Sequence, residues 1–296
     1  MINMKKTILI TIILVTILSF YAQVQAQPYN YEYVNVTTRA NITNAGPEIL
    51  EVLIDQDITL NAGSTKLVQC NSTIRDWNGW DDIILVNATL YHETSTSNAA
   101  DNGNTHYTNA SCLNTGDDGE FLAYYTCGFD VIHYANNGTW TCNVTAEDTF
   151  TFTDSLTNTT SINELYALNV TDTIDYGDLA VTDTSADVPA TVTNFGNMNV
   201  NVSVLGYGAV EGDGYGLICE QGSNITVENQ RFAITAAVDW NDKVPLAQTA
   251  QDMSITLLQP TDGTQPVTHQ TYWQLFVPPN PFGVCTGTIR FTATAT

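Results

Sequence analysis

Two cysteines, Cys70 and Cys142, each lie in a run in which apolar and polar side chains alternate. Val68 and Ile74 share the parity of the first cysteine, and Trp140 shares the parity of the second. Because successive side chains of a β-strand point to opposite faces, both cysteines are expected to face inward beside apolar neighbours. The pattern predicts two strands in facing sheets that a disulfide joins.

The chain contains six cysteines, an even number that indicates a disulfide framework in an exported protein. Two flank the turn-rich segment 114–119 and predict a clip across a hairpin, two others enclose that hairpin, and the last two belong to the C-terminal half. The expected pairs are Cys112–Cys127, Cys70–Cys142 and Cys219–Cys285. No C-x-x-C pair occurs and the four histidines are scattered, so metal binding by cysteine is the weaker alternative.

The first residues are typical of a secretory signal peptide. Lys5 and Lys6 precede an apolar run over residues 8–20, and small residues suited to cleavage follow. We therefore expect residues 1–26 to be removed and the secreted, extracellular chain to begin at Gln27. An uncleaved membrane anchor is the alternative, although the run is shorter than the roughly 20 residues of a typical span. No later stretch is apolar enough to span a bilayer, so no membrane span is expected in the mature chain.

Threonine, valine, isoleucine and tyrosine dominate the rest of the chain, and only 13% of residues are charged. β-Branched and aromatic residues suit a pleated sheet, whereas a helical protein would be richer in Glu, Lys, Leu and Ala. We expect an all-β protein of two tandem antiparallel β-sandwich domains, immunoglobulin-like or jelly-roll-like. The formal net charge of −23 repels nucleic acid and attracts cations, so no nucleic-acid partner is expected.

The expected organisation is an immunoglobulin-like sandwich with an N-terminal arm over residues 27–154, a Thr/Ser/Asn-rich linker over residues 155–161, and a C-terminal sandwich over residues 162–296. Clusters of Gly, Asn and Asp separate the strands of the first domain. These strands are expected at Val34–Thr43, Thr65–Arg75, Asp82–Tyr91, Phe121–Tyr134 and Gly138–Ala146.

Eleven Asn-x-Ser/Thr sequons are spread along the chain. In six of them the middle residue is Val or Ile, so that in a strand the apolar residue is buried while the asparagine points to water. We expect covalently attached glycans at several of these sites, with accidental sequons in a threonine-rich chain as the alternative. The sequons are Asn35, Asn41, Asn71, Asn87, Asn109, Asn137, Asn143, Asn158, Asn169, Asn201 and Asn224.

The arrangement of tryptophans and cysteines in the first half resembles that of an immunoglobulin-like surface domain. Cys70 lies in an early strand, Trp77 or Trp80 follows shortly after it, and Trp140 stands two residues before Cys142. Immunoglobulin domains usually carry a tyrosine at this last position, and its hydroxyl anchors a corner of the fold. An indole can donate only through its N–H.

Two strand-like runs in the second half are joined by Asn194-Phe-Gly-Asn197, which predicts a hairpin, and the segment 273–291 ends in a Thr-Gly-Thr-Ile strand. This pattern resembles the β-sandwich domains of archaeal secreted surface proteins and is distantly similar to the sandwich subunits of extracellular fibres. The resemblance implies a sandwich fold and a structural role at the cell surface.

Sequence motifs of catalytic sites are absent: there is no G-x-S-x-G elbow, no H-E-x-x-H and no phosphate-binding glycine loop. No cysteine remains as a nucleophile once all six are paired. We expect no enzymatic activity, with a pair of carboxylates for glycoside hydrolysis as the alternative.

The segment 76–82 is the strongest candidate for ion binding. It places Asp76, Asn78, Asp81 and Asp82 around a glycine turn, and hard cations bind several oxygens that converge from a flexible loop. The segment therefore predicts a calcium site, although no motif requires a cofactor. A hydrogen-bonded turn that leads into the next strand is the alternative.

Aromatic residues offer a third kind of binding site. A sugar-stacking platform is one interpretation of the tryptophans, and burial in the core or at a sheet edge is the other. The tryptophans concerned are Trp77, Trp80, Trp240 and Trp273.

Tyrosine alternates with other residues at Tyr29, Tyr31 and Tyr33, just after the expected cleavage point. The alternation predicts a strand with one aromatic face. Such an arm can add to a sheet of the next subunit, and head-to-tail addition builds open filaments. The first strand of its own domain is the alternative.

These features together favour a non-enzymatic structural protein of the cell exterior that associates with itself or with other surface proteins. The alternative is an adhesin that binds carbohydrate or a partner protein through calcium.

Overall fold

The computed structural model describes Thr11, residues 35–261, Gly263 and residues 266–296. The chain divides into residues 1–43 and a larger unit, residues 44–296. Apart from Thr11, the expected signal peptide lies outside the described residues, as do the arm residues Tyr29, Tyr31 and Tyr33. Within the described part of the chain, no helix is long and apolar enough to cross a membrane.

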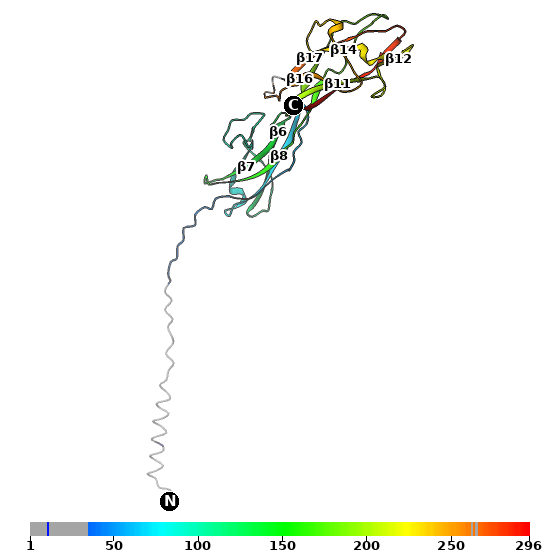
Figure 1. Ribbon diagram of the computed structural model, residues 1–296. Helices are drawn as coiled ribbons and strands as arrows, with labels where there is room; N and C mark the ends of the chain where they lie inside the picture. Colours follow the sequence, from blue (N-terminus) through cyan, green and yellow to red (C-terminus); the bar gives the residue numbers. More distant parts are fainter. Residues whose placement is uncertain (1–10, 12–34, 262, 264–265) are drawn as a thin grey trace. The chain divides into compact units, whose positions relative to one another are not determined.

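The predicted all-β fold is confirmed, and every pair of neighbouring strands in the sheets is antiparallel. Two four-stranded sheets form the N-terminal half (Figure 1). The first has the order β1-β2-β6-β5, with β1 at Glu48–Ile54, β2 at Thr65–Arg75, β6 at Leu122–Ile132 and β5 at Leu113–Asp117. The second has the order β4-β3-β7-β8, with β4 at His106–Asn109, β3 at Ile83–His92, β7 at Gly138–Asp148 and β8 at Thr153–Ile162.

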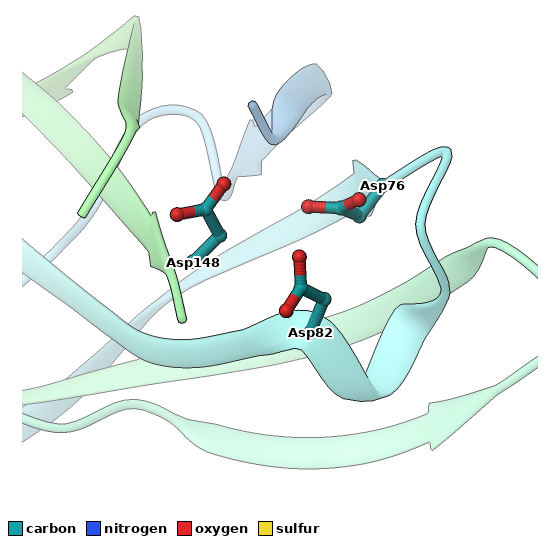
Figure 2. Close-up of side chains that lie close together, drawn as sticks. All are labelled: Asp76, Asp82 and Asp148. Carbon is teal, nitrogen blue, oxygen red and sulfur yellow. The ribbon is translucent and has the colours of Figure 1, made fainter. Parts of the chain in front are cut away.

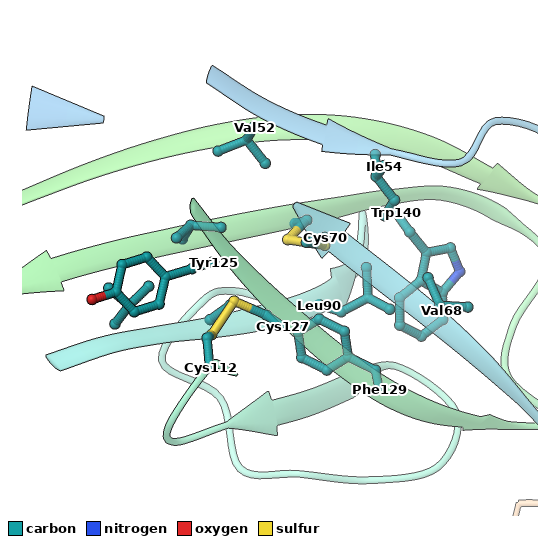
Figure 3. Packing of buried hydrophobic residues seen from close by; sticks show 14 of the residues in the cluster. Val52, Ile54, Val68, Cys70, Leu90, Cys112, Tyr125, Cys127, Phe129 and Trp140 are labelled. Carbon is teal, nitrogen blue, oxygen red and sulfur yellow. A yellow bond between two sulfur atoms is a disulfide. The ribbon is translucent and has the colours of Figure 1, made fainter. Parts of the chain in front are cut away.

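Side chains from both sheets share one hydrophobic core (Figure 3). The predicted alternation is present in β2 and β7, where Cys70 and Cys142 have no exposed surface. Trp140 is also fully buried, and its Nε1 donates a hydrogen bond of 2.8 Å to the carbonyl oxygen of Asn136. The indole therefore ties its strand to the turn that precedes it.

The C-terminal half has three further sheets and a separate hydrophobic core around Trp273 and Phe232, whose ring centroids are 5.3 Å apart. A five-stranded sheet has the order β15-β14-β17-β10-β9, with β15 at Val244–Pro245, β14 at Gln230–Ala233, β17 at Thr268–Leu275, β10 at Val188–Asn194 and β9 at Leu168–Val170. A three-stranded sheet has the order β16-β11-β19, with β16 at Gln251–Leu257, β11 at Val200–Tyr207 and β19 at Thr288–Ala295. The last sheet has the order β13-β12-β18, with β13 at Ile225–Thr226, β12 at Tyr215–Gln221 and β18 at Phe282–Thr286.

Within the described residues of 44–296, the helical content is limited to short 3₁₀ turns. They are η1 at Trp80–Asp82, η2 at Val227–Asn229 and η3 at Trp240–Asp242.

The strand predicted at Val34–Thr43 is wrong for its described residues, 35–43, which contain no strand. Val36 and Ile42 are 80% and 86% exposed, so their apolar side chains find no sheet to pack against. The first strand is instead β1, whose inward residues Ile49 and Val52 are buried in the core.

Two predictions about connections are also wrong. Residues 155–161 are not a linker, because they lie within β8 and pair with β7 along its length. The predicted hairpin through Asn194 and Asn197 does not form, because β10 pairs with β17 and β9 whereas β11 pairs with β16 and β19. The turn therefore carries the chain from one sheet to another, where each strand can bury an apolar face.

Candidate metal centre

Three aspartates meet at one end of the N-terminal half. Asp76 directly follows β2, Asp82 ends η1, and Asp148 is the last residue of β7. One carboxylate oxygen of each lies within 4.8 Å of the corresponding atoms of the other two. Figure 2 shows the three carboxylates directed toward a shared space. Asp76 and Asp148 have no exposed surface, and Asp82 is half-buried.

Asp148 and Asp82 are held by the turn after β7. The backbone N–H groups of Phe150 and Phe152 donate to Oδ1 of Asp148 at 2.8 and 2.9 Å. The Thr149 hydroxyl donates to Oδ1 of Asp82, and the Thr149 N–H donates to the Asp82 carbonyl oxygen at 3.0 Å. The two side chains are thereby positioned by the same short segment.

Hydrogen bonds also link Asp76 and Asp148 to the chain segments on either side of the site. Oδ1 of Asp76 accepts a hydrogen bond of 2.8 Å from the N–H of Asn78. Oδ2 of Asp148 accepts one of 2.6 Å from Nδ2 of Asn44. Burial raises the pKa of the Asp76 carboxyl, the N–H of Asn78 opposes this rise, and the charges of Asp82 and Asp148 add to it.

Of the four ligands that the sequence indicated, the structure brings Asp76 and Asp82 together. Asp81 lies outside the group, and Oδ1 of Asn78 accepts a hydrogen bond of 2.8 Å from the N–H of Ala45. Sequence reasoning missed Asp148. Strand parity could have indicated this residue, because Asp148 lies an even number of residues after Cys142 in β7 and therefore faces inward as well.

The donor atoms of the cluster are all carboxylate oxygens, which suit a hard cation rather than zinc or copper. Because Asp76 and Asp148 have no exposed surface, a sugar ring cannot reach them, and the arrangement does not suit glycoside hydrolysis. The cluster is therefore a candidate metal centre.

The four tryptophans do not form one sugar-stacking platform. Trp273 is fully buried in the C-terminal core, and Trp240 lies under the guanidinium of Arg231 at 4.6 Å. Trp77 is 57% exposed and its ring centroid lies 5.3 Å from that of Phe121. Trp80 packs against the N-terminal core.

The structure contains disulfides at all three expected pairs, Cys70–Cys142, Cys112–Cys127 and Cys219–Cys285. The first joins β2 of one sheet to β7 of the other. None of the eleven sequon asparagines is buried.

No protein-family model matches the chain, and no curated protein matches it at a significant level. Among solved structures, the protein is similar to a chain of the CsuC–CsuE chaperone–tip adhesion subunit pre-assembly complex from archaic chaperone-usher Csu pili of Acinetobacter baumannii. The sequence identity is 10% over 82% of this chain and 99% of that chain, and the TM-score is 0.41. It is similar to a chain of the chaperone–tip adhesin complex of CFA/I fimbriae at 9% identity, over 85% and 84% of the two chains, with a TM-score of 0.29. It is similar to tandem immunoglobulin domains of titin at 10% identity, over 85% and 97%, with a TM-score of 0.25. At TM-scores this low, the similarities indicate nothing about ligand, partner or activity.

Proposed function

We propose that this protein is a non-enzymatic structural subunit of an extracellular surface assembly, such as an envelope layer or a filament. The three disulfides carry the proposal, because disulfides form and persist in oxidising compartments and are rare in the cytosol. The signal-peptide pattern of residues 1–26 and the resemblance to archaeal secreted surface proteins support export. The N-terminal and C-terminal halves have separate hydrophobic clusters, one in the first and two in the second, which supports a division into tandem sandwich domains.

N-glycans are part of this proposal. Eleven sequons in a chain of low charge content would cover a strand-rich surface with hydrated sugar. Glycans and disulfides together would protect an exposed assembly from proteolysis and from association through its sheet edges.

Self-association by strand addition requires a donor strand and an acceptor sheet edge. The donor is the arm with Tyr29, Tyr31 and Tyr33, whose alternation suits strand addition. The acceptor is β19, an eight-residue strand that pairs with β11 on one side and with no described strand on the other. An unpaired edge of this length is a template for a strand of another chain. The arm of one copy would add to β19 of the next.

Negative-stain microscopy of native surface material and of the purified protein tests the proposal. Ordered filaments or sheets that an antibody against this chain labels are expected. Deletion of residues 27–33 should leave monomers, whereas Tyr31→Phe, which keeps the aromatic face, should still assemble. A protein that stays monomeric at every concentration and is missing from surface material would contradict the structural role.

An adhesin is the second candidate, because exposed aromatic residues stand close to members of the aspartate cluster in the sequence. Trp77 follows Asp76, and Phe150 and Phe152 follow Asp148 at 63% and 53% exposure. Aromatic faces beside a cation suit carbohydrate. Calcium-dependent glycan binding by a monomer, lost in Trp77→Ala, would favour this candidate over assembly.

A further inference from the structure

Three buried oxygen atoms at the aspartate cluster have no hydrogen-bond partner. They are Oδ2 of Asp76, Oδ2 of Asp82 and Oδ1 of Asn44, and no donor among the described residues reaches them. Asp76 has no exposed surface, and its carboxylate points toward those of Asp82 and Asp148 (Figure 2). A buried acceptor without a donor is costly, and a charged one is costlier still. A cation bound between the aspartates would compensate the unpaired carboxylate oxygens.

The described residues supply no cation to this place. Arg75, the neighbour of Asp76 in sequence, forms its ion pair with Glu48 at 2.6 Å and lies over the ring of Trp77 at 4.6 Å. Each ion pair of the described chain involves a carboxylate outside the cluster. Three aspartates therefore face one another without compensation from lysine, arginine or histidine.

The chemistry of the oxygens selects the ion. The donor set contains carboxylates, with no cysteine or histidine. Ca²⁺ takes about six to eight oxygens in flexible geometry, whereas Mg²⁺ demands a near-ideal octahedron and Zn²⁺ prefers nitrogen and sulfur. The geometry points to a calcium site formed by Asp76, Asp82 and Asp148, beside which Nδ2 of Asn44 donates a hydrogen bond to Oδ2 of Asp148.

The site connects segments that are far apart in the sequence. Asp76 directly follows a strand of one sheet and Asp148 ends a strand of the facing sheet, while Asn44 lies where the larger unit begins. A calcium ion held by the three aspartates joins the ends of the two sheets, and the hydrogen bond from Asn44 to Asp148 links the first residue of that unit to the same place. The ion has a structural role, and its binding does not depend on whether the protein assembles.

The test uses the secreted full chain, stripped with EDTA and titrated with CaCl₂. Calorimetry is expected to show one saturable site, and saturating calcium should raise Tm by about 5 °C. Tb³⁺ should bind at the same place and give luminescence sensitised by the nearby Trp77 and Trp80. An unchanged Tm together with no saturable binding up to about 10 mM Ca²⁺ would overturn the site. Equal affinity for MgCl₂ would overturn the assignment of calcium.

Matched variants separate the cluster from its neighbours. Asp82→Asn should weaken calcium binding about tenfold or more, because it removes a ligand charge while keeping the shape. Asp81→Asn makes the same change at an exposed position one residue away, and it should keep the wild-type affinity. Equal weakening by both variants, or none by Asp82→Asn, would contradict the proposal.

The Asp76→Asn variant distinguishes the loss of a calcium ligand from a loss of binding that is due to misfolding. Removal of a buried, uncompensated charge should raise the Tm of the calcium-free protein above that of the wild type. The same variant should lose the rise in Tm on addition of calcium. A lower calcium-free Tm, or an intact calcium response, would count against the site.

Discussion

A carboxylate oxygen of Asp76 lies within 4.8 Å of one of Asp148. Asp76 follows Cys70 by six residues and Asp148 follows Cys142 by six, and the two cysteines form a disulfide. Cys70 and Cys142 lie on the inward faces of β2 and β7, one strand in each of the facing sheets, Asp148 is the last residue of β7, and Asp76 directly follows β2. Six residues of strand span about 20 Å, so the disulfide and the aspartates link the same two strands at well-separated points. A relative slip of either strand would disturb both links.

Loss of the Cys70–Cys142 disulfide should be strongly destabilising. The cysteines are 72 residues apart, so the double variant Cys70→Ala/Cys142→Ala should lower the free energy of unfolding by about 4 kcal/mol. Urea unfolding under non-reducing conditions measures this. The pair Cys112→Ala/Cys127→Ala, with a separation of 15, is the control and should cost about 3 kcal/mol. A smaller loss for the long loop than for the short one would contradict the chain-entropy account.

The disulfides should be reduced in a defined order under native conditions. Cys70 and Cys142 have no exposed surface, whereas Cys219 and Cys285 are half-buried. Thiolate attack requires access to a sulfur atom, so mild reductant should open Cys219–Cys285 well before Cys70–Cys142. Timed alkylation followed by peptide mass spectrometry gives the order, and early labelling of Cys70 would contradict it.

The loss of stability on breaking a buried ion pair in the C-terminal half should depend on which of the two partners is removed. Nζ of Lys243 lies 2.8 Å from Oδ1 of Asp187, without an aligned hydrogen bond, and the lysine side chain has no exposed surface. Asp187→Ala leaves a buried ammonium unpaired and should cost about 3 kcal/mol in the free energy of unfolding. Lys243→Met leaves only a partly exposed carboxylate and should cost less. Thermal denaturation compares the two, and the reverse ranking would contradict the argument.

Asp213 should make stability depend on pH in the acid range. Its carboxylate accepts hydrogen bonds from the backbone N–H groups of Gly208, Ala209, Val210 and Tyr215. Burial acts to raise the pKa of Asp213, but these hydrogen bonds outweigh it and lower the pKa to about 2. A lowered pKa means that the stabilisation is present above the ordinary value of 3.8 and is lost as pH falls toward 2.

Asp213→Asn removes this titration. The difference in free energy of unfolding between wild type and variant should be constant above about pH 5 and shrink between about pH 4 and pH 2. Urea unfolding at several pH values measures it, and the other carboxylates cancel because both proteins contain them. A difference that stays constant down to pH 2 would show that the hydrogen bonds do not hold the charge.

Glycan occupancy should differ between sequons that expose their amide and those that do not. Asn71 is exposed on the outer face of β2, and its Oδ1 accepts a hydrogen bond of 2.6 Å from Thr126. Nδ2 of Asn158 instead donates at 2.8 Å to the carbonyl oxygen of Val52, between β8 and β1. Glycopeptide mass spectrometry of native material should find sugar at Asn71 and none at Asn158. The opposite result would mean that glycosylation precedes and overrides this packing.

Alternation of side chains made much of the N-terminal half predictable. The predicted strand Thr65–Arg75 coincides with β2, and the inward parity of Cys70 and Cys142 placed both in the core. The same reasoning failed for Val34–Thr43, because alternation shows which side of a strand is apolar but not whether a sheet is there to cover it.

By itself the sequence determined the all-β class and the inward cysteines, because a period of two residues is a local property of the chain. The three disulfide pairs followed from the order of the six cysteines around a predicted hairpin. Only the tertiary structure decided which aspartates meet. Asn44 and Asp148 are 104 residues apart and Asp76 and Asp148 are in different sheets, so their contact depends on how strands from distant segments pair and how the sheets face each other. No spacing within 76–82 contains that information, and for this reason the local motif supplied two members of the cluster and missed the third.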